Sequence, residues 1–203
     1  MTELQKCFSS GLSYPDYVNL IGDLLAENRT TGPNQSEAYI AYTRQNLQRM
    51  RRADKISKRE VEQGGFDAGV VSCHYKWLVF TEAWCGDAAN IIPVLAAAAD
   101  HSEAIDMKLV MRDAHPAVFD HFLTNGSRSI PKLVIMDAAH DEVLATWGPR
   151  PKEAQALFLK LRQDEAPMEV LIESLTRWYV TDKGRSTLKE VAALMENLLT
   201  AKT

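Results

Sequence analysis

Cys85 is the candidate catalytic residue of the segment TEAWCGDAANIIPVL, where it lies between Trp84 and Gly86. A cysteine directly before a helix meets unpaired backbone N–H groups and the positive end of the helix dipole, and both favour a thiolate. Gly86 permits a tight bend that leaves the sulfur uncovered, while Trp84 is expected to shield one side of it. Asp87 favours the first helical turn but opposes ionisation of a nearby thiol. The segment therefore predicts an exposed thiol, and the sign of its pKa shift stays open.

A second sulfur is missing from this motif, because Ala88 occupies the position three residues after Cys85. The three cysteines, at positions 7, 73 and 85, form neither an even disulfide framework nor a zinc-binding spacing. The five histidines are scattered, so we expect neither a metal nor another cofactor. Cys73 stands near the start of a predicted strand and is expected at the wrong end to reach Cys85. Cys7 belongs to an extension whose position the sequence does not give.

The composition excludes several classes of protein. The 203 residues are 46% hydrophobic, enough for a substantial core, and the net charge of -4 gives no general attraction to nucleic acid or anionic membrane. No apolar run approaches the length of a membrane span, and the N-terminal residues lack the pattern of a secretory signal. We therefore expect a cytoplasmic protein that binds neither nucleic acid nor membrane. A basic run between Arg44 and Arg59 is interpreted as the solvated face of a helix.

Helical periodicity dominates the first third of the chain. Apolar residues from Tyr14 to Leu25 recur at helical spacing, the polar segment NRTTGPNQS reads as a loop, and a second amphipathic helix is expected to begin near Ser36.

The middle third predicts the order strand, helix, strand, helix, strand, strand, helix. The corresponding segments are 77–80, 91–99, 107–111, 117–123, 132–136, 142–147 and roughly 152–162. The two consecutive strands are joined by the short turn AAHD, which indicates an antiparallel hairpin. Pro93 is expected to kink the first of these helices.

The last third is helical again, with apolar stripes over 168–179 and 188–199. Thr187 and Glu190 have the spacing of a capping box for the final helix. We expect these helices to pack against the central domain or against a second subunit, and the oligomeric state is left open.

Two segments of the middle third carry a family resemblance. Val79-Phe-Thr-Glu-Ala-Trp-Cys-Gly86, with Pro93 eight residues after the cysteine, resembles the active-site strand, loop and helix of the thioredoxin superfamily. Ser129-Ile-Pro-Lys-Leu-Val134 resembles the cis-proline loop of that family, and Gly148 follows the next strand as in its members. The nearest likeness is to bacterial thioredoxin-like proteins that carry a W-C-G-D motif within helical extensions, and it covers roughly residues 70 to 165.

The resemblance implies an α/β fold, with a central mixed sheet flanked by helices and with helical extensions at both ends. The expected domains are an N-terminal extension (1–68), a thioredoxin-like domain (69–165) and a C-terminal extension (166–203). It also implies a cis peptide bond before Pro131, which would leave the backbone of Ile130 facing the thiol and able to pair with an extended peptide. The implied substrate-binding residues are Trp84, Gly86, Asp87, Ile130 and Pro131.

The sequence departs from the family pattern at two positions. Ala88 replaces the second cysteine, which in the family attacks the mixed disulfide, and Val79 replaces a buried acid. Glu82 could accept a proton in place of that acid, although a solvated loop glutamate is the default interpretation. Arg128 could steer an acidic substrate or the thiolate from the same groove, or it could be an exposed loop residue. Arg112 and Asp113 follow the second strand, where functional residues are often found.

Three functions follow from these residues. The first is monothiol exchange, in which Cys85 attacks a protein or peptide disulfide and a low-molecular-weight thiol, or a second protein, resolves the product. The second is an inactive peptide-binding module or redox sensor on the same scaffold. The third is a variant in which the second cysteine has been replaced, which would trap a mixed disulfide.

Overall fold

The computed structural model describes residues 1–66 and 74–200. Its centre is a four-stranded sheet in the order β2-β1-β3-β4. Strand β1 (Tyr75–Thr81) pairs in parallel with β2 (Ile105–Met111) and antiparallel with β3 (Lys132–Asp137). Strand β4 (Val143–Trp147) pairs antiparallel with β3. The mixed sheet and the final hairpin are thus confirmed, whereas Cys73 and the boundary expected at residues 68 and 69 lie outside the described residues.

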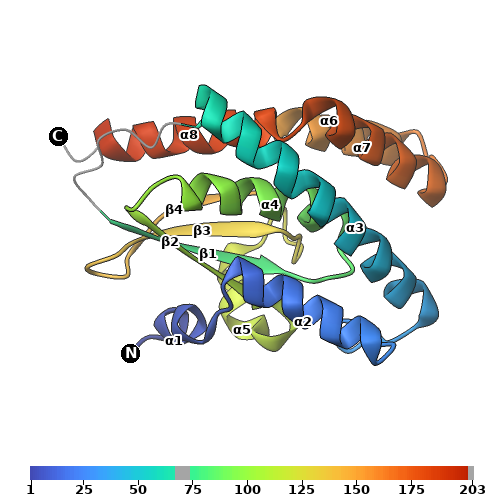
Figure 1. Cartoon of the computed structure of the whole chain (residues 1–203), viewed down its shortest axis with the longest axis horizontal. Coiled ribbons are helices and arrows are strands. Elements are labelled where there is room, and N and C mark those ends of the chain that lie inside the picture. Colours follow the sequence, from blue (N-terminus) through green and yellow to red (C-terminus); the bar gives the residue numbers. More distant parts are fainter. Residues whose placement is uncertain (67–73, 201–203) are drawn as a thin grey trace.

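Helices cover both faces of this sheet (Figure 1). Helix α4 lies directly on one face, with α3, α7 and α8 outside it, while α1, α2 and α5 lie on the other side. The α-helices are α1 (Glu3–Ser10), α2 (Tyr14–Ala26), α3 (Glu37–Glu60), α4 (Gly86–Asp100), α5 (Pro116–Phe119), α6 (Lys152–Gln163), α7 (Met168–Asp182) and α8 (Arg185–Thr200). The shorter helical turns are η1 (Val61–Gly65), η2 (Arg112–Ala114) and η3 (Asp120–Phe122). The thioredoxin-like architecture and its helical extensions are therefore present.

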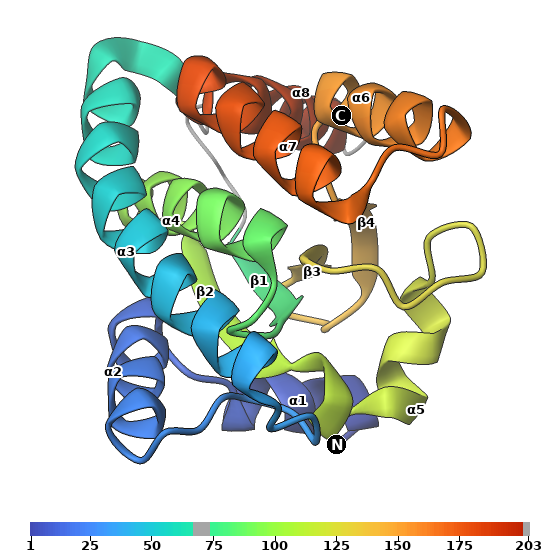
Figure 2. The same ribbon diagram turned by 90° about the vertical axis from the view of Figure 1, so that its right-hand side faces the viewer.

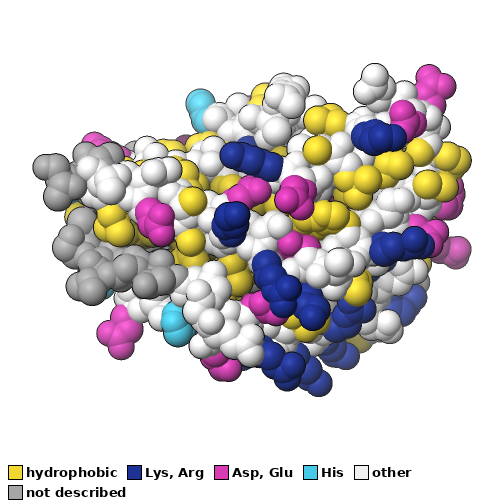
Figure 3. Space-filling view, turned by 90° about the horizontal axis from the view of Figure 1, so that it is seen from above, with side chains coloured by type: hydrophobic (Ala, Val, Ile, Leu, Met, Phe, Trp, Pro, Cys, Tyr) yellow, Lys and Arg dark blue, Asp and Glu magenta, His cyan; other side chains and the backbone are white. Residues whose placement is uncertain are grey.

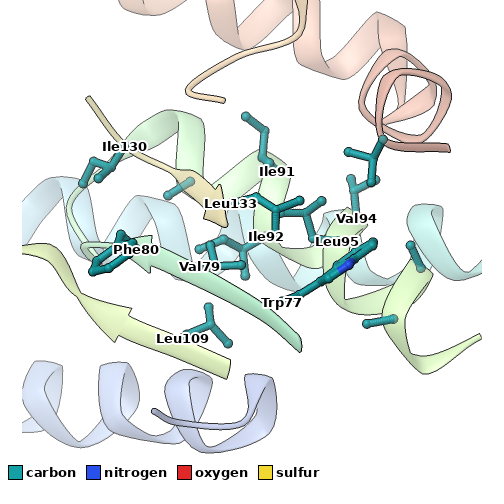
Figure 4. Close-up of a cluster of buried hydrophobic side chains, with 14 of the residues drawn as sticks. Trp77, Val79, Phe80, Ile91, Ile92, Val94, Leu95, Leu109, Ile130 and Leu133 are labelled. Atoms are coloured by element: carbon teal, nitrogen blue, oxygen red, sulfur yellow. The ribbon is translucent and has the colours of Figure 1, made fainter. Parts of the chain in front are cut away.

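The core lies between the sheet and α4. Strand β1 is buried on both faces, which explains its continuous apolar run. Figure 4 shows Val79 of β1 gathered with Ile92 and Leu95 of α4 and with Leu133 of β3. Helix α4 runs unbroken through Pro93, and small alanines on its outer side let α3 pack closely against it. This packing fixes the start of α4 against the end of β1.

The N-terminal extension is joined to the sheet by backbone hydrogen bonds. The N–H of Leu12 donates to the carbonyl of Leu109 in β2, and the N–H of Leu109 donates back to Leu12, each at 2.8 Å. The bridge covers part of the exposed edge of β2, where unpaired backbone groups would otherwise invite pairing with another chain. The extension is thus part of the folded unit.

The last helix of the C-terminal extension begins at a different residue from the one that the sequence predicts. Helix α8 begins at Arg185, so Thr187 lies inside it, and the predicted capping box with Glu190 is wrong. The Glu190 carboxylate instead accepts hydrogen bonds from Trp147 Nε1 at 2.9 Å and from the N–H of Lys152 at 2.7 Å. The Glu190 side chain therefore binds the end of β4 and the start of α6 and does not cap its own helix.

The outer surface is mixed in character. Figure 3 shows hydrophobic, acidic and basic side chains side by side, with Lys and Arg gathered toward the lower edge of the face in view. The basic run of α3 is mostly exposed, but Arg49 is half-buried and differs from its neighbours. None of the helices among the described residues has the length and apolar character needed to cross a bilayer.

Candidate thiol site

Cys85 is the residue directly before α4, as the motif predicts. Its backbone N–H donates to the carbonyl of Glu82 at 3.1 Å, which closes a tight turn after β1. Its carbonyl accepts from the N–H of Ala89 at 3.1 Å and so begins the helix. The apolar strand and the buried helix therefore fix the position of Cys85 between them.

The loop before β3 lies against this sulfur. Cys85 Sγ donates a hydrogen bond to the carbonyl of Ile130 at 3.4 Å, and the Ile130–Pro131 peptide bond is cis. Gly148, at φ +112°, packs directly against the loop that contains Pro131. Only glycine fits at this position, because a Cβ would lie 2.4 Å from the Pro131 carbonyl oxygen. The two segments that carried the family resemblance thus meet at Cys85.

The thiol is less exposed than the motif suggests. Cys85 is only 8% exposed, and burial raises the pKa of its thiol to about 12, with the charge of Asp87 adding to the shift. The backbone N–H groups of Asp87 and Ala88 and the charge of Arg150 act in the opposite direction. The expectation of an uncovered sulfur is therefore wrong, because neighbouring groups bury Cys85. The pKa of the thiol rises because this desolvation outweighs the backbone N–H groups at the start of α4.

Asp87 is held by two residues that are distant in sequence. Its Oδ2 lies 2.6 Å from Arg150 Nη2, and its Oδ1 accepts a hydrogen bond from the Tyr179 hydroxyl at 2.8 Å. The guanidinium of Arg150 also lies 4.0 Å from the centre of the Phe158 ring. Burial raises the pKa of the Asp87 carboxyl, and Arg150 and Tyr179 counteract this. The cluster connects the C-terminal extension to the first turn of α4.

Glu82 is fully buried, so its default interpretation as a solvated loop residue is wrong. Its Oε1 accepts a hydrogen bond from the N–H of Asp113 at 3.0 Å, and its Oε2 has no partner of good geometry among the described residues. Burial raises the pKa of this carboxyl, opposed by the Thr31 side chain and the Asp113 N–H. Gly32 lies beside this pair with φ +76°, and a Cβ there would lie 3.0 Å from Asp113 Oδ2 and 3.4 Å from Glu82 Oε2.

The N-terminal extension holds the loop that carries Cys85. The N–H of Ala83 donates to Thr31 Oγ1 at 2.9 Å, and Asn46 Nδ2 donates to the carbonyl of Ala83 at 2.9 Å. Trp84 packs on Tyr39, with ring centroids 5.1 Å apart. Residues from the loop before α3 and from α3 itself therefore position the turn that carries Cys85.

A groove of about 640 Å³ opens over Cys85. It runs between α3, the start of α4, the loops before β3 and α6, and the α6–α7 pair, whose arrangement can be followed in Figure 2. The predicted site residues that line it are Trp84, Cys85, Gly86, Asp87, Arg128 and Ile130. Pro131 lies behind Ile130, Ala88 is buried in α4, and Glu82 lies beneath the loop, so none of these three lines the groove.

Cys7 lies at the opposite end of β1. Gln5 of the same helix hydrogen-bonds Asp141, which pairs with Lys76 at the start of that strand at 2.6 Å. Thr81, the last residue of β1, is five positions beyond Lys76, a span of roughly 16 Å along the strand. Cys7 therefore cannot resolve a mixed disulfide at Cys85. Among the described residues, no group of three or more His, Cys, Asp and Glu is placed to hold a metal.

Sequence reasoning missed several residues of this site. The sequence places Arg49 in an exposed basic run, but its side chain lines the groove. Neither Arg150 nor Tyr179 belongs to a recognisable motif, although both contact Asp87. The sequence signal for Arg49 is its place in the chain, one residue before the buried Met50 and two after the buried Leu47.

The fold and the meeting of Cys85 with the Pro131 loop define a thioredoxin-like protein. A family model described as "Thioredoxin" matches residues 32–167, and the chain belongs to this family. The match includes α3, which shows that the family's common region begins within the N-terminal helical part.

Two crystal structures share the fold at low sequence identity. One is of a protein of unknown function, PA1234 from Pseudomonas aeruginosa, with a TM-score of 0.62, 16% identity, and coverage of 97% of this chain and 99% of that one. The other is an HIV epitope scaffold with a TM-score of 0.60, 16% identity, and coverage of 95% and 97%. No curated protein matches the sequence. Both structures therefore align with this chain over nearly its whole length, which includes the helical extensions.

Proposed function

We propose that this protein performs thiol–disulfide exchange of monothiol type, with Cys85 as the nucleophile. The observation that carries the proposal is the position of Cys85 Sγ, which lines a groove and lies 3.4 Å from the carbonyl of Ile130. In the first step the Cys85 thiolate attacks one sulfur of a disulfide, a new S–S bond forms, and the other sulfur leaves as a thiolate. In the second step an external thiol attacks the mixed disulfide and Cys85 is released.

The positions of the described cysteines support an external thiol as the resolving group, while Cys73 lies outside the described residues. Ala88 occupies the place of an internal resolving residue, and Cys7 lies at the far end of β1. Both Cys7 and Cys85 are free thiols, which fits a reducing compartment. We therefore propose a cytoplasmic location, with protein or peptide disulfides as substrates and a low-molecular-weight thiol as reductant.

A second function is supported by the protonated state of the thiol. A buried Cys85 with a raised pKa reacts slowly at neutral pH, which is the property expected of an inactive peptide-binding module. In that case the groove and the Ile130 backbone would bind an extended peptide without covalent chemistry.

Reduction of a glutathionylated peptide by reduced glutathione distinguishes these functions. If the protein performs monothiol exchange, the native protein should reduce the peptide with turnover. This turnover should be abolished in Cys85→Ser and retained in Cys7→Ser, the matched control. Turnover that persists in Cys85→Ser would contradict the proposal. Peptide binding that is unchanged in Cys85→Ser, without turnover in either protein, would establish the binding module instead.

A further inference from the structure

Four arginines line the groove over Cys85, and each comes from a different part of the fold. Arg49 lies on α3, Arg112 follows β2, Arg128 precedes β3, and Arg150 precedes α6. Among the described residues that line the groove, Asp87 is the only acid. The protein as a whole carries a net charge of -4, so this concentration of positive charge opposes the average of the surface. Such a contrast favours an anionic ligand.

Three of these arginines are already paired with carboxylates. Arg150 contacts Asp87 at 2.6 Å, Arg112 contacts Asp113 at 2.7 Å, and Arg128 contacts Asp120 at 2.6 Å. Each of these pairs leaves little net charge in the groove.

Arg49 has no carboxylate partner among the described residues. Its Nη1 donates to Asn46 Oδ1 at 2.8 Å, a neutral acceptor, and burial lowers the pKa of its guanidinium. The same nitrogen would lie 3.7 Å from a Cβ at Gly86, the residue next to Cys85. A half-buried and uncompensated cation is costly until an anion pairs with it. Arg49 is therefore the point at which a bound carboxylate would be stabilised most.

The dimensions of the site favour a small ligand. A volume of about 640 Å³ falls in the usual range for small-molecule sites, and aromatic side chains of Tyr39, Trp84 and Phe158 form part of the walls. Cys85 lies recessed at the base of the groove and is only 8% exposed. A disulfide on the surface of a folded protein would therefore reach this sulfur less readily than the disulfide of a small molecule.

We infer that the groove binds a small thiol, or its disulfide, that carries carboxylate groups, and that Arg49 binds one of those carboxylates. This inference rests on the proposed function and gives the external thiol its chemical class. The Cys85 thiolate attacks one sulfur of the small disulfide and forms a mixed disulfide with that half of the molecule. The S–S bond of the small disulfide breaks, and the other half leaves as a thiolate.

Exchange rates with three disulfides of different charge test the inference. The probes are oxidised glutathione, which is anionic, bis(2-hydroxyethyl) disulfide, which is neutral, and cystamine, which is cationic. Each rate at Cys85 is divided by the rate of the same disulfide with N-acetylcysteinamide, a neutral reference thiol. We expect the anionic probe to exceed the neutral one by about 10-fold and the cationic probe to be slowest, with the differences shrinking at high salt.

Two variants on α3 locate the charge responsible. Arg49→Gln should reduce the preference for the anionic over the neutral probe by about 10-fold. Arg51→Gln removes the same charge from an exposed position on the same helix and should leave the preference unchanged. Equal losses in both variants, or no charge preference in the native protein, would overturn the inference while leaving the proposed exchange in place. A preference for acidic protein disulfides over oxidised glutathione would overturn it as well.

A binding measurement separates the inference from the proposed function. S-methylglutathione carries the carboxylates but has no reactive sulfur, and its binding to Cys85→Ser can be followed by calorimetry. Binding at millimolar concentration that is lost when Arg49→Gln is added supports the site even if no exchange is detected. Absence of binding in Cys85→Ser would overturn the inference, whatever the exchange assay shows.

Discussion

Arg150 Nη2 lies 2.6 Å from Asp87 Oδ2, and this ion pair joins the loop before α6 to the residue two positions after Cys85. Both side chains are nearly buried, so their charges are weakly screened by solvent. The negative member raises the pKa of the Cys85 thiol and the positive member lowers it. The ion pair therefore places opposing charges beside the same sulfur.

Replacing Asp87 with asparagine should make Cys85 more reactive. The change removes the charge that opposes ionisation and leaves that of Arg150, so alkylation of Cys85 by iodoacetamide at pH 8 should accelerate about 10-fold. The unpaired Arg150 should lower the free energy of unfolding by about 3 kcal/mol. Asp106→Asn, at an exposed position of β2, is the matched control. An unchanged or slower alkylation rate would show that the Asp87 charge does not act on the thiol.

The pH dependence of Cys85 should reflect a thiol that stays protonated. With a pKa of about 12, its alkylation rate should rise about tenfold per pH unit from pH 7 to 10 without a plateau. Mass spectrometry of the peptide that contains Cys85 separates this rate from that of the other cysteines. A plateau below pH 9 would mean that the thiolate is stabilised in the folded protein.

The same pKa has a consequence for stability. An unfolded cysteine ionises near pH 9.0, whereas the folded Cys85 ionises only near pH 12, so the unfolded state loses its proton first. The contribution of Cys85 is therefore fully present below about pH 9 and is lost as the pH rises towards 12. The difference in unfolding free energy between native protein and Cys85→Ala, measured by urea denaturation from pH 8 to 10.5, should decrease with pH. A constant difference would contradict the raised pKa.

The sequence predicts the fold well because its signals are local. The apolar run of β1, the turn before α4 and the hairpin of β3 and β4 each depend on residues close together in the chain. The position of Cys85 follows from the same signals. Its burial does not, because the groups that enclose it come from α3, α7 and the loop before α6.

Arg49 and Tyr179 illustrate this limit. The helical pattern places Arg49 in a basic run and Tyr179 in an apolar stripe, and neither pattern encodes which element lies opposite. The contact of Tyr179 with Asp87 spans 92 positions of the chain. Only the packing of the extensions on α4 brings these side chains to the site.

Tyr179→Phe tests the connection between α7 and α4. The change removes one hydrogen bond to a buried carboxylate and keeps the ring, so the free energy of unfolding should fall by about 1.5 kcal/mol. Thermal or urea denaturation measures the loss, and Tyr42→Phe, at an exposed position of α3, is the control. A loss equal to that of Tyr42→Phe would mean that the Tyr179 hydroxyl contributes nothing to stability.

Glu82→Gln should stabilise the protein at neutral pH but not at acidic pH. Burial raises the folded pKa of Glu82 above its unfolded value of 4.5, so the folded state resists losing this proton. The stability that the protonated form provides is present below about pH 4.5 and is lost as the pH rises through the folded pKa. Glutamine imitates the protonated acid at every pH, so its gain in unfolding free energy should be about 1 kcal/mol at pH 7 and near zero at pH 4. Glu142→Gln, at an exposed position before β4, should show no such pH dependence. A loss of stability at pH 7 would mean that Glu82 is ionised and well solvated by its neighbours in the folded state.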